Sequence, residues 1–204
     1  MSTVRICADT HFGHVNMAIK RGFNSVEEHD EHIIEQWNSV VHKRDMTYIL
    51  GDITMEKKDS YPLLDRLNGR IIVVLGNHDK AQHIVELLNY VEAVSGMTKY
   101  KGIFLSHCPI HPREMEYRVP YNIHGHIHEH VVTMEGKTMD GSPVTVEDTR
   151  YICVSMEQID YKPKTIGELI PNWDDADFRN NYLWELKKKI EAEKGKMFDN
   201  DVEN

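Results

Sequence analysis

One short stretch of the sequence, residues 71–79, limits the folds that this chain can adopt. Residues 71–75 are five consecutive apolar residues, most of them β-branched, and the run stops at a glycine. Such a run is typical of a strand that is buried on both faces. The polar tripeptide Asn77-His78-Asp79 follows at once. Because open α/β sheets bind ligands beyond the carboxyl ends of their strands, the stretch predicts a buried strand with functional side chains at its end.

Further apolar runs alternate with helical patterns along the 204 residues. Short apolar or alternating runs predict strands at residues 3–8, 46–50, 91–94, 99–100, 103–105, 121–123, 131–134, 144–146 and 151–155. Apolar residues at helical spacing predict helices at residues 26–41, 59–67 and 81–90. Strands that alternate with helices indicate an α/β fold built in layers.

A change in composition near residue 174 marks the end of the predicted domain. Apolar residues then recur at every fourth position and predict one amphipathic helix; they are Phe178, Tyr182, Leu186 and Ile190. We expect one domain over residues 1–172, followed over residues 173–204 by this helix and a polar tail. The helix can pack on the domain or on a second copy, so a monomer and a homodimer both remain open.

Charge and cysteine content limit the functional class. A formal net charge of -9 argues against sequence-independent binding to a nucleic-acid backbone, which needs an excess of Lys and Arg. It does not argue against a metal-dependent enzyme acting on phosphates, because bound divalent ions reverse the local sign. Three widely spaced cysteines do not indicate a disulfide framework, and no apolar run reaches the roughly 18 residues of a membrane helix. We therefore expect a cytoplasmic protein without a membrane partner.

Five of the predicted strands share one feature, since each ends in Asp, Asn or His. The side chains concerned are Asp9, His11, Asp52, Asn77, His107, His126 and His128. A single buried histidine is usually structural. Five strands that end in this way favour a shared site, because the ends of strands in an α/β sheet converge on one crevice.

These seven side chains are too many for one metal ion. A transition metal takes about four to six ligands, and a catalytic site leaves at least one position open. Seven ligands suit two ions that share one carboxylate, as in hydrolases whose ions lie ~3.5–4 Å apart. The mixture of imidazole and carboxylate favours Mn, Fe, Zn, Ni or Co over Ca²⁺ and Mg²⁺ and does not choose among the five. Of these, we expect Mn²⁺.

Two such ions supply what the hydrolysis of a phosphoester requires. They neutralise the phosphoryl oxygens and lower the pKa of a bridging water, so that a hydroxide is the nucleophile. No Ser or Cys nucleophile is then needed. A further histidine should protonate the leaving oxygen, and His78, beside Asn77, is the candidate.

The strand-end motifs resemble those of the calcineurin-like metallophosphoesterase superfamily. The resemblance covers about residues 4–156 and rests on Asp9-Thr10-His11, Gly51-Asp52, Gly76-Asn77-His78-Asp79, His107 and Gly125-His126-Ile127-His128. The run Asp-Thr-His-Phe-Gly-His near the N-terminus is similar to small bacterial and bacteriophage members. The resemblance implies a four-layer α/β/β/α sandwich with two packed mixed β-sheets.

The resemblance also implies how the ligands divide between two ions. One ion would be held by Asp9, His11, Asp52 and His128. The other would be held by Asp52, Asn77, His107 and His126. Asp52 would bridge the two ions, and His78 would be the acid or the donor to the transition state.

One motif departs from the Ser/Thr protein phosphatases of the superfamily. Those enzymes carry Gly-Asp-x-x-Asp-Arg-Gly, whereas the run here is Gly51-Asp52-Ile53-Thr54-Met55-Glu56-Lys57. The missing second Asp and the missing Arg argue against a protein phosphatase. Because that Asp orients the catalytic histidine, either Asp79 or Glu56 would have to orient His78 here.

Three residues outside these motifs are candidates for binding substrate. His14 either contacts a phosphate or the metal, or makes a local hydrogen bond at a helix start. Residues 109–120 link two ligand-bearing strands, and Arg113 or Arg118 can clamp a phosphate unless the segment is only a solvated polar loop. Cys108 follows His107, and for its thiol we favour a packing role over an approach to the site.

The sequence therefore predicts a dinuclear metallophosphoesterase, a phosphodiesterase or phosphatase acting on small phosphorylated molecules or nucleotides. A nuclease acting on DNA or RNA is the first alternative, and the lack of a basic groove disfavours it. A non-catalytic, metal-stabilised scaffold is the second, and the presence of every expected ligand disfavours it.

Overall fold

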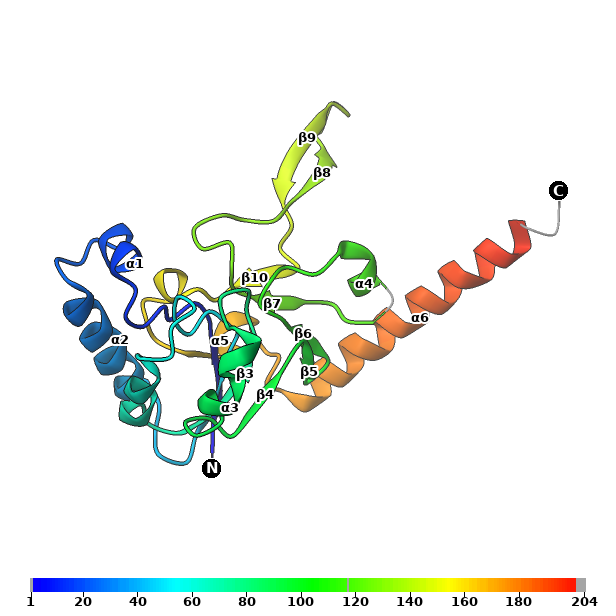
Figure 1. The fold of residues 1–204 in the computed structure, drawn as a ribbon. Coiled ribbons are helices and arrows are strands. Elements are labelled where there is room, and N and C mark those ends of the chain that lie inside the picture. Colours follow the sequence, from blue (N-terminus) through cyan, green and yellow to red (C-terminus); the bar gives the residue numbers. More distant parts are fainter. Residues whose placement is uncertain (1, 117, 201–204) are drawn as a thin grey trace.

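The computed structural model describes residues 2–116 and 118–200 and contains two mixed β-sheets (Figure 1). The first sheet has the strand order β11-β1-β2-β3-β4. Its strands are β11 Lys164–Thr165, β1 Val4–Cys7, β2 Met46–Ile49, β3 Arg70–Val74 and β4 Ala93–Ser95. Strands β1 to β4 are parallel, and β11 pairs antiparallel with β1.

The second sheet has the order β10-β7-β6-β5. Its strands are β10 Tyr151–Cys153, β7 Asn122–His124, β6 Ile103–Leu105 and β5 Thr98–Tyr100. Strands β6, β7 and β10 are parallel, and β5 forms the predicted hairpin with β6. A separate hairpin of β8 (Thr133–Lys137) and β9 (Pro143–Glu147), also predicted, projects from the body of the molecule (Figure 1).

The helices are short except for two. The α-helices are α1 Val15–Lys20, α2 Val26–Val40, α3 Ile84–Leu87, α4 Pro112–Glu116, α5 Ile166–Leu169 and α6 Ala176–Asn200. The 3-10 helices are η1 Tyr61–Arg66, η2 Ala81–His83 and η3 Met156–Gln158. Across residues 2–116 and 118–200, none of these helices is both long enough and apolar enough to span a bilayer.

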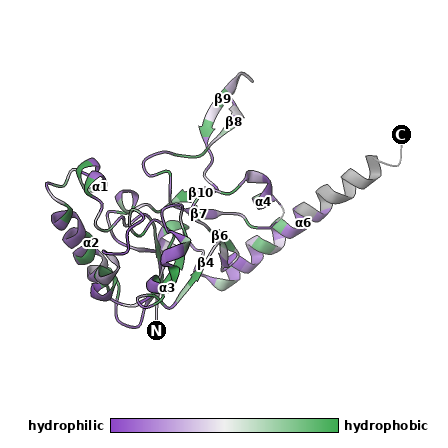
Figure 2. Cartoon of the chain, in the orientation of Figure 1, coloured by the Kyte–Doolittle hydropathy of each residue, from purple (hydrophilic) through white to green (hydrophobic). Residues whose placement is uncertain are grey.

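Helix α2 shows how the local sequence determines an element. Its N-cap, Ser25, accepts a hydrogen bond from the backbone N–H of Glu28, which satisfies one of the free donors at the helix start. Ile33 and Trp37 lie on one face at helical spacing and are completely buried. Figure 2 shows the resulting mixture of hydrophobic and hydrophilic residues along the helix.

One apolar core takes side chains from both sheets. Ile6 and Val73 of the first sheet and Leu105 and Ile123 of the second belong to the same cluster and are fully buried. The backbone N–H of Ala8, just past β1, donates to the carbonyl of Val154, just past β10, over 2.8 Å. The two sheets therefore meet at the ends of their strands as well as through their side chains.

The predicted α/β class is confirmed, and several details differ. Residues 81–90 do not form one helix but divide into η2 and α3. Within these two short helices only the side chain of Leu87 is buried, so little packing holds a longer helix together. Residues 59–67 form only the 3-10 helix η1. Helices α1, α4 and α5 and strand β11 were not predicted, and each has six residues or fewer.

Helix α6 lies where the C-terminal helix was predicted, but its apolar stripe is only partly covered. Phe178 and Tyr182 are 44% and 38% exposed, and the side chain of Ile190 lies outside the described residues. Tyr182 packs on Trp173, and Leu183, which is not part of the stripe, packs against the core. Trp173, just after the predicted domain boundary, is fully buried. The chain therefore joins the core up to this tryptophan before α6 leads away from the body (Figure 1).

Two tryptophans provide a matched test of this packing. The indole of Trp37 is fully buried and donates to the carbonyl of Asn68, whereas Trp184 on α6 is 51% exposed. Trp37→Ala should lower the free energy of unfolding by about 3–5 kcal/mol, because it removes buried area and leaves a cavity. Trp184→Ala should change it by no more than about 0.5 kcal/mol. Urea unfolding measures both, and equal losses would contradict the described core.

Candidate metal centre

The carboxyl ends of five parallel strands meet at one place. Asp9 and His11 follow β1, and Asp52 follows β2. Asn77 follows β3, His107 follows β6, and the pair His126 and His128 follows β7. The first two loops run side by side, since the N–H groups of Asp9 and His11 donate to the carbonyls of Gly51 and Asp52. The structure thus brings together all seven residues that the sequence predicts as ligands, and their role as ligands stays a prediction.

Two glycines allow these loops to approach closely. A Cβ on Gly76 would lie 2.3 Å from Oδ1 of Asp52, and one on Gly125 would lie 2.5 Å from Oδ2 of Asp9. Real Cβ atoms essentially never come so close to other atoms. Any other residue at these positions would push the aspartates out of place.

Left-handed backbone conformations gather at the same site. Positive φ angles of 49° to 71° occur at five of the seven predicted ligands, namely His11, Asp52, His128, Asp9 and His126. For residues other than glycine this conformation costs about 1–3 kcal/mol each and persists only where the surroundings enforce it. Such strain is typical of functional sites, because it aims side chains at positions that a regular strand cannot reach.

A first cluster contains Asp9, His11 and His128. One donor atom from each lies within 4.8 Å of the others. Both ring nitrogens of His11 and Oδ1 of Asp9 are buried, and none has a hydrogen-bond partner. Burial and the charge of Arg21 lower the pKa of His11 to about 2, so the ring is neutral. Burial also raises the pKa of Asp9 to about 6, which reflects the cost of an unneutralised carboxylate there.

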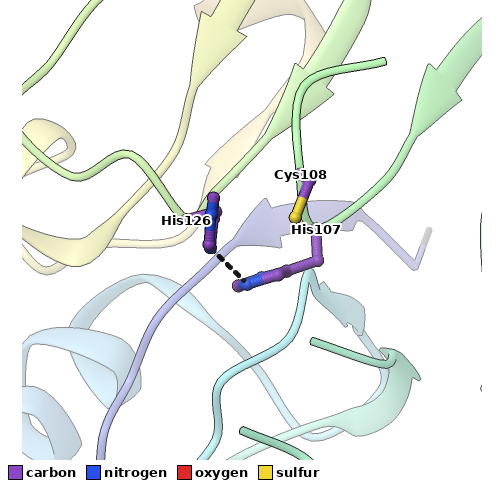
Figure 3. Close-up of side chains that lie close together, drawn as sticks. All are labelled: His107, Cys108 and His126. Atoms are coloured by element: carbon purple, nitrogen blue, oxygen red, sulfur yellow. Dashed lines mark hydrogen bonds between the residues drawn. The ribbon is translucent and has the colours of Figure 1, made fainter. Parts of the chain in front are cut away.

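A second cluster surrounds His107, whose Nδ1 donates to the carbonyl of Leu50 over 2.8 Å. This bond leaves Nε2 of the neutral ring as an acceptor. Nε2 nevertheless lies 2.7 Å from Oδ1 of Asn77, 3.1 Å from Nδ1 of His126 and 3.4 Å from Oδ2 of Asp52. Figure 3 shows the side chains of His107 and His126 pointing toward each other, with the contact between their ring nitrogens dashed. Acceptor atoms that converge in this way require a shared proton or a cation between them.

Asp52 stands between the two clusters. Its Oδ2 lies 3.4 Å from His107 of the second cluster and 3.9 Å from His11 of the first. Asp52 is 2% exposed, and within the described part of the chain neither it nor Asp9 forms an ion pair with a lysine or arginine. The residues therefore fit divalent cations, because the buried carboxylates and free acceptors lack the positive charge that they need.

His78 lies at the edge of this site with its side chain 25% exposed, and its Nε2 is 4.0 Å from Oδ2 of Asp52. Of the two residues that the sequence left open as its partner, Glu56 is the neighbour, with Oε1 3.4 Å from Nδ1 of His78. The carboxylate of Asp79 instead accepts hydrogen bonds from the backbone N–H groups of Asp52, Ile53 and Gly76. Asp79 therefore holds two strand-end loops together and does not orient His78.

A buried network behind His128 was missed in the sequence. Nδ1 of His128 lies 2.6 Å from Oε1 of Glu157, and Oε2 of Glu157 pairs with Arg21, whose side chain is 2% exposed. Arg21 also donates to the carbonyl of Asp9 over 2.7 Å. Burial would raise the pKa of Glu157, but the His128 hydrogen bond and the charge of Arg21 outweigh it and lower that pKa to about 2. The network fixes the ring of His128 so that Nε2 faces the first cluster.

The candidate substrate residues have different positions. His14 is the N-cap of α1 without a side-chain capping bond, its ring lies 5.4 Å from that of His11, and its buried Nδ1 has no partner. The alternative of a side-chain bond at the helix start is therefore not observed. Arg118 pairs with Glu114 of α4 and is 60% exposed, and Arg113 is exposed. No described hydrogen bond or ion pair links either arginine to the clusters, so their substrate role stays a prediction.

Comparison with known proteins identifies the family but not an activity. The chain is 32% identical over 178 residues to the uncharacterized protein MJ1445 of Methanocaldococcus jannaschii, which covers 83% of this chain and 90% of that protein. The chain therefore belongs to the same family as MJ1445. No model of a protein family matches the sequence.

The chain is also similar to a protein of known structure and to a bacteriophage protein. The crystal structure of AQ665 from Aquifex aeolicus, a protein of unknown function, aligns with a TM-score of 0.58 and 26% identity, covering 83% of this chain and 98% of that chain. The Gene 66 protein of Mycobacterium phage D29 is 38% identical over 84 residues, which is 39% of this chain and 42% of that protein.

The glycine contacts predict a selective loss of metal binding. Gly125→Ala should displace Asp9 and cost about 1–3 kcal/mol of stability, because the added methyl group overlaps Ala8 and Asp9. Gly96→Ala is the matched control, since a Cβ there has no neighbour within 4 Å. Calorimetric titration with Mn²⁺ measures the affinity for the metal. An unchanged affinity in Gly125→Ala would contradict the predicted role of Asp9 as a metal ligand.

The buried network predicts a metal defect without loss of a ligand. Glu157→Gln should weaken metal binding by about 10–100-fold, because His128 loses the carboxylate that orients its ring. Glu129→Gln is the control, since Glu129 is next to His128 in the chain but pairs with Lys20 at the surface. Equal affinities of the two variants in the same titration would exclude Glu157 from positioning His128.

Proposed function

We propose that this protein is a metal-dependent phosphoester hydrolase of the calcineurin-like superfamily, with two divalent ions at the ends of its parallel strands. The observation that carries the proposal is the pair of donor clusters on either side of Oδ2 of Asp52, with buried acceptor atoms that lack partners. The four-layer arrangement implied by the sequence resemblance belongs to the same proposal.

The donor atoms divide into two sets. Asp9, His11, Asp52 and His128 would hold one ion, and Asp52, Asn77, His107 and His126 would hold the other. Ions bound in this way would neutralise phosphate charge and lower the pKa of water toward neutrality. Imidazole and carboxylate donors favour Mn²⁺ or a neighbouring transition metal over Ca²⁺.

The remaining chemistry belongs to the protein. Nε2 of His78 lies 4.0 Å from Oδ2 of Asp52, which is beyond hydrogen-bond distance, so Nε2 is free to bond to a substrate oxygen. Oε1 of Glu56 lies 3.4 Å from Nδ1 of His78, and Lys80 pairs with the same oxygen over 2.8 Å. We infer that His78 donates its Nε2 proton to the leaving oxygen.

The net charge of the chain limits the substrate class. The net charge of -9 disfavours a long polyanion, so small phosphodiesters, phosphomonoesters and nucleotides fit better than DNA or RNA. The test is a purified protein loaded with Mn²⁺ and screened against aryl phosphoesters, mononucleotides, cyclic nucleotides and dinucleotides. Turnover that a chelator abolishes supports the proposal, and no turnover with any transition metal would refute it.

Removal of the proposed acid should separate catalysis from metal binding. His78→Ala should retain the metal content of the wild type and lose roughly 10²–10⁴ in kcat, the usual contribution of a general acid. His83→Ala is the matched control, because His83 lies in η2 and the one described hydrogen bond of its side chain is to the exposed Gln82. An unchanged kcat in His78→Ala would remove His78 from the mechanism.

A further inference from the structure

Cys108 lies beside the second cluster, which agrees with the less favoured of the two roles that the sequence left open. Its thiol is free, and the residue is exposed. Sγ and one ring nitrogen each of His107 and His126 all lie within 4.8 Å of one another. Figure 3 shows these three side chains together at the end of β6 and the start of the loop after β7.

The backbone around Cys108 is held in place. The hydroxyl of Ser106 donates to the carbonyl of Cys108 over 2.7 Å, and the amide of Asn122 donates to the same hydroxyl over 2.9 Å. Asn122 is completely buried in β7. The turn that carries His107 and Cys108 is therefore tied to the neighbouring strand, and the position of the thiol follows from this anchoring.

The other two cysteines have different surroundings. Cys7 is buried in the core. Cys153 contacts the carbonyl of His128 and the hydroxyl of Ser155 through its Sγ. Within the described residues, Cys108 alone joins two histidines in a group of potential metal donors.

A second observation points to a cation at the free ring nitrogen of His107. The bond from Nδ1 to the carbonyl of Leu50 leaves Nε2 free, and Oδ2 of the buried Asp52 lies 3.4 Å from Nε2. His107 also forms a group of donors within 4.8 Å with Asp9 and Asp52, and Oδ1 of Asp9 is buried without a partner. Carboxylate oxygens therefore gather beside the histidine that Cys108 follows in the chain.

We propose that Cys108 is a thiolate ligand of the ion held by His107 and His126, and that it makes this site selective for a softer metal. The thiol would lose its proton to solvent when the ion binds, because the thiolate is the form that coordinates metal. Sulfur donors favour Zn²⁺ and Cd²⁺ over Mn²⁺, whereas the set of Asp9, His11 and His128 has no sulfur. The two positions would then differ in metal preference.

This inference rests on the proposed metal pair but not on the hydrolase activity. It is tested with Cd²⁺, whose bond to a thiolate gives a sulfur-to-metal charge-transfer absorption in the ultraviolet. The wild-type protein should develop this absorption as Cd²⁺ is added, and it should saturate at one thiolate per chain. Cys108→Ser should abolish the absorption, and Cys153→Ser, the matched control, should retain it.

Two further measurements distinguish a missing thiolate ligand from a missing metal pair. Equilibrium dialysis counts the bound Cd²⁺, and iodoacetamide tests whether the metal protects Cys108 of the wild-type chain from alkylation. Two bound ions with neither absorption nor protection would overturn the thiolate ligand and leave the proposed function standing. No bound ion would refute the metal pair itself. Absorption that persists in Cys108→Ser would also overturn the inference.

Discussion

Two buried carboxylates without a lysine or arginine partner among the described residues give this site its need for positive charge. Asp9 and Asp52 are 0% and 2% exposed, and the cost of leaving such charges unneutralised is several kcal/mol per ion. Burial raises the pKa of Asp9 to about 6, so the charge is disfavoured in the protein alone. Divalent cations would remove this penalty, and the histidines around the two aspartates would supply neutral donors for the same ions.

Keeping these carboxylates together costs the fold stability. Five predicted ligands have left-handed backbone conformations, and Gly76 and Gly125 bring backbone and aspartate closer than any Cβ would permit. Asp79 accepts hydrogen bonds from three backbone N–H groups of two loops. Arg21 donates to the carbonyl of Asp9 in the loop after β1. Hydrogen bonds from protein groups thus hold the strained loops in place.

Much of this arrangement could be predicted from the sequence because it depends on local patterns. Apolar runs define the strands, and the polar residue after each run lies at the sheet edge whatever the details of packing. The buried pair of Arg21 and Glu157 could not be predicted, because the two residues are far apart in the chain and no periodicity links them. Helix α1 escaped prediction because its six residues, Val15–Lys20, are too few to show a helical period of apolar positions. The position of the Cys108 thiol depends on the turn after β6, which residue type alone does not determine.

The central claim is that the strand ends hold two ions that share Asp52. The most direct test is an anomalous difference map from crystals grown with Mn²⁺. The account predicts two peaks ~3.5–4 Å apart on either side of the Asp52 carboxylate, one beside His11 and His128 and the other beside Asn77 and His107. A single peak, or peaks away from Asp52, would contradict it.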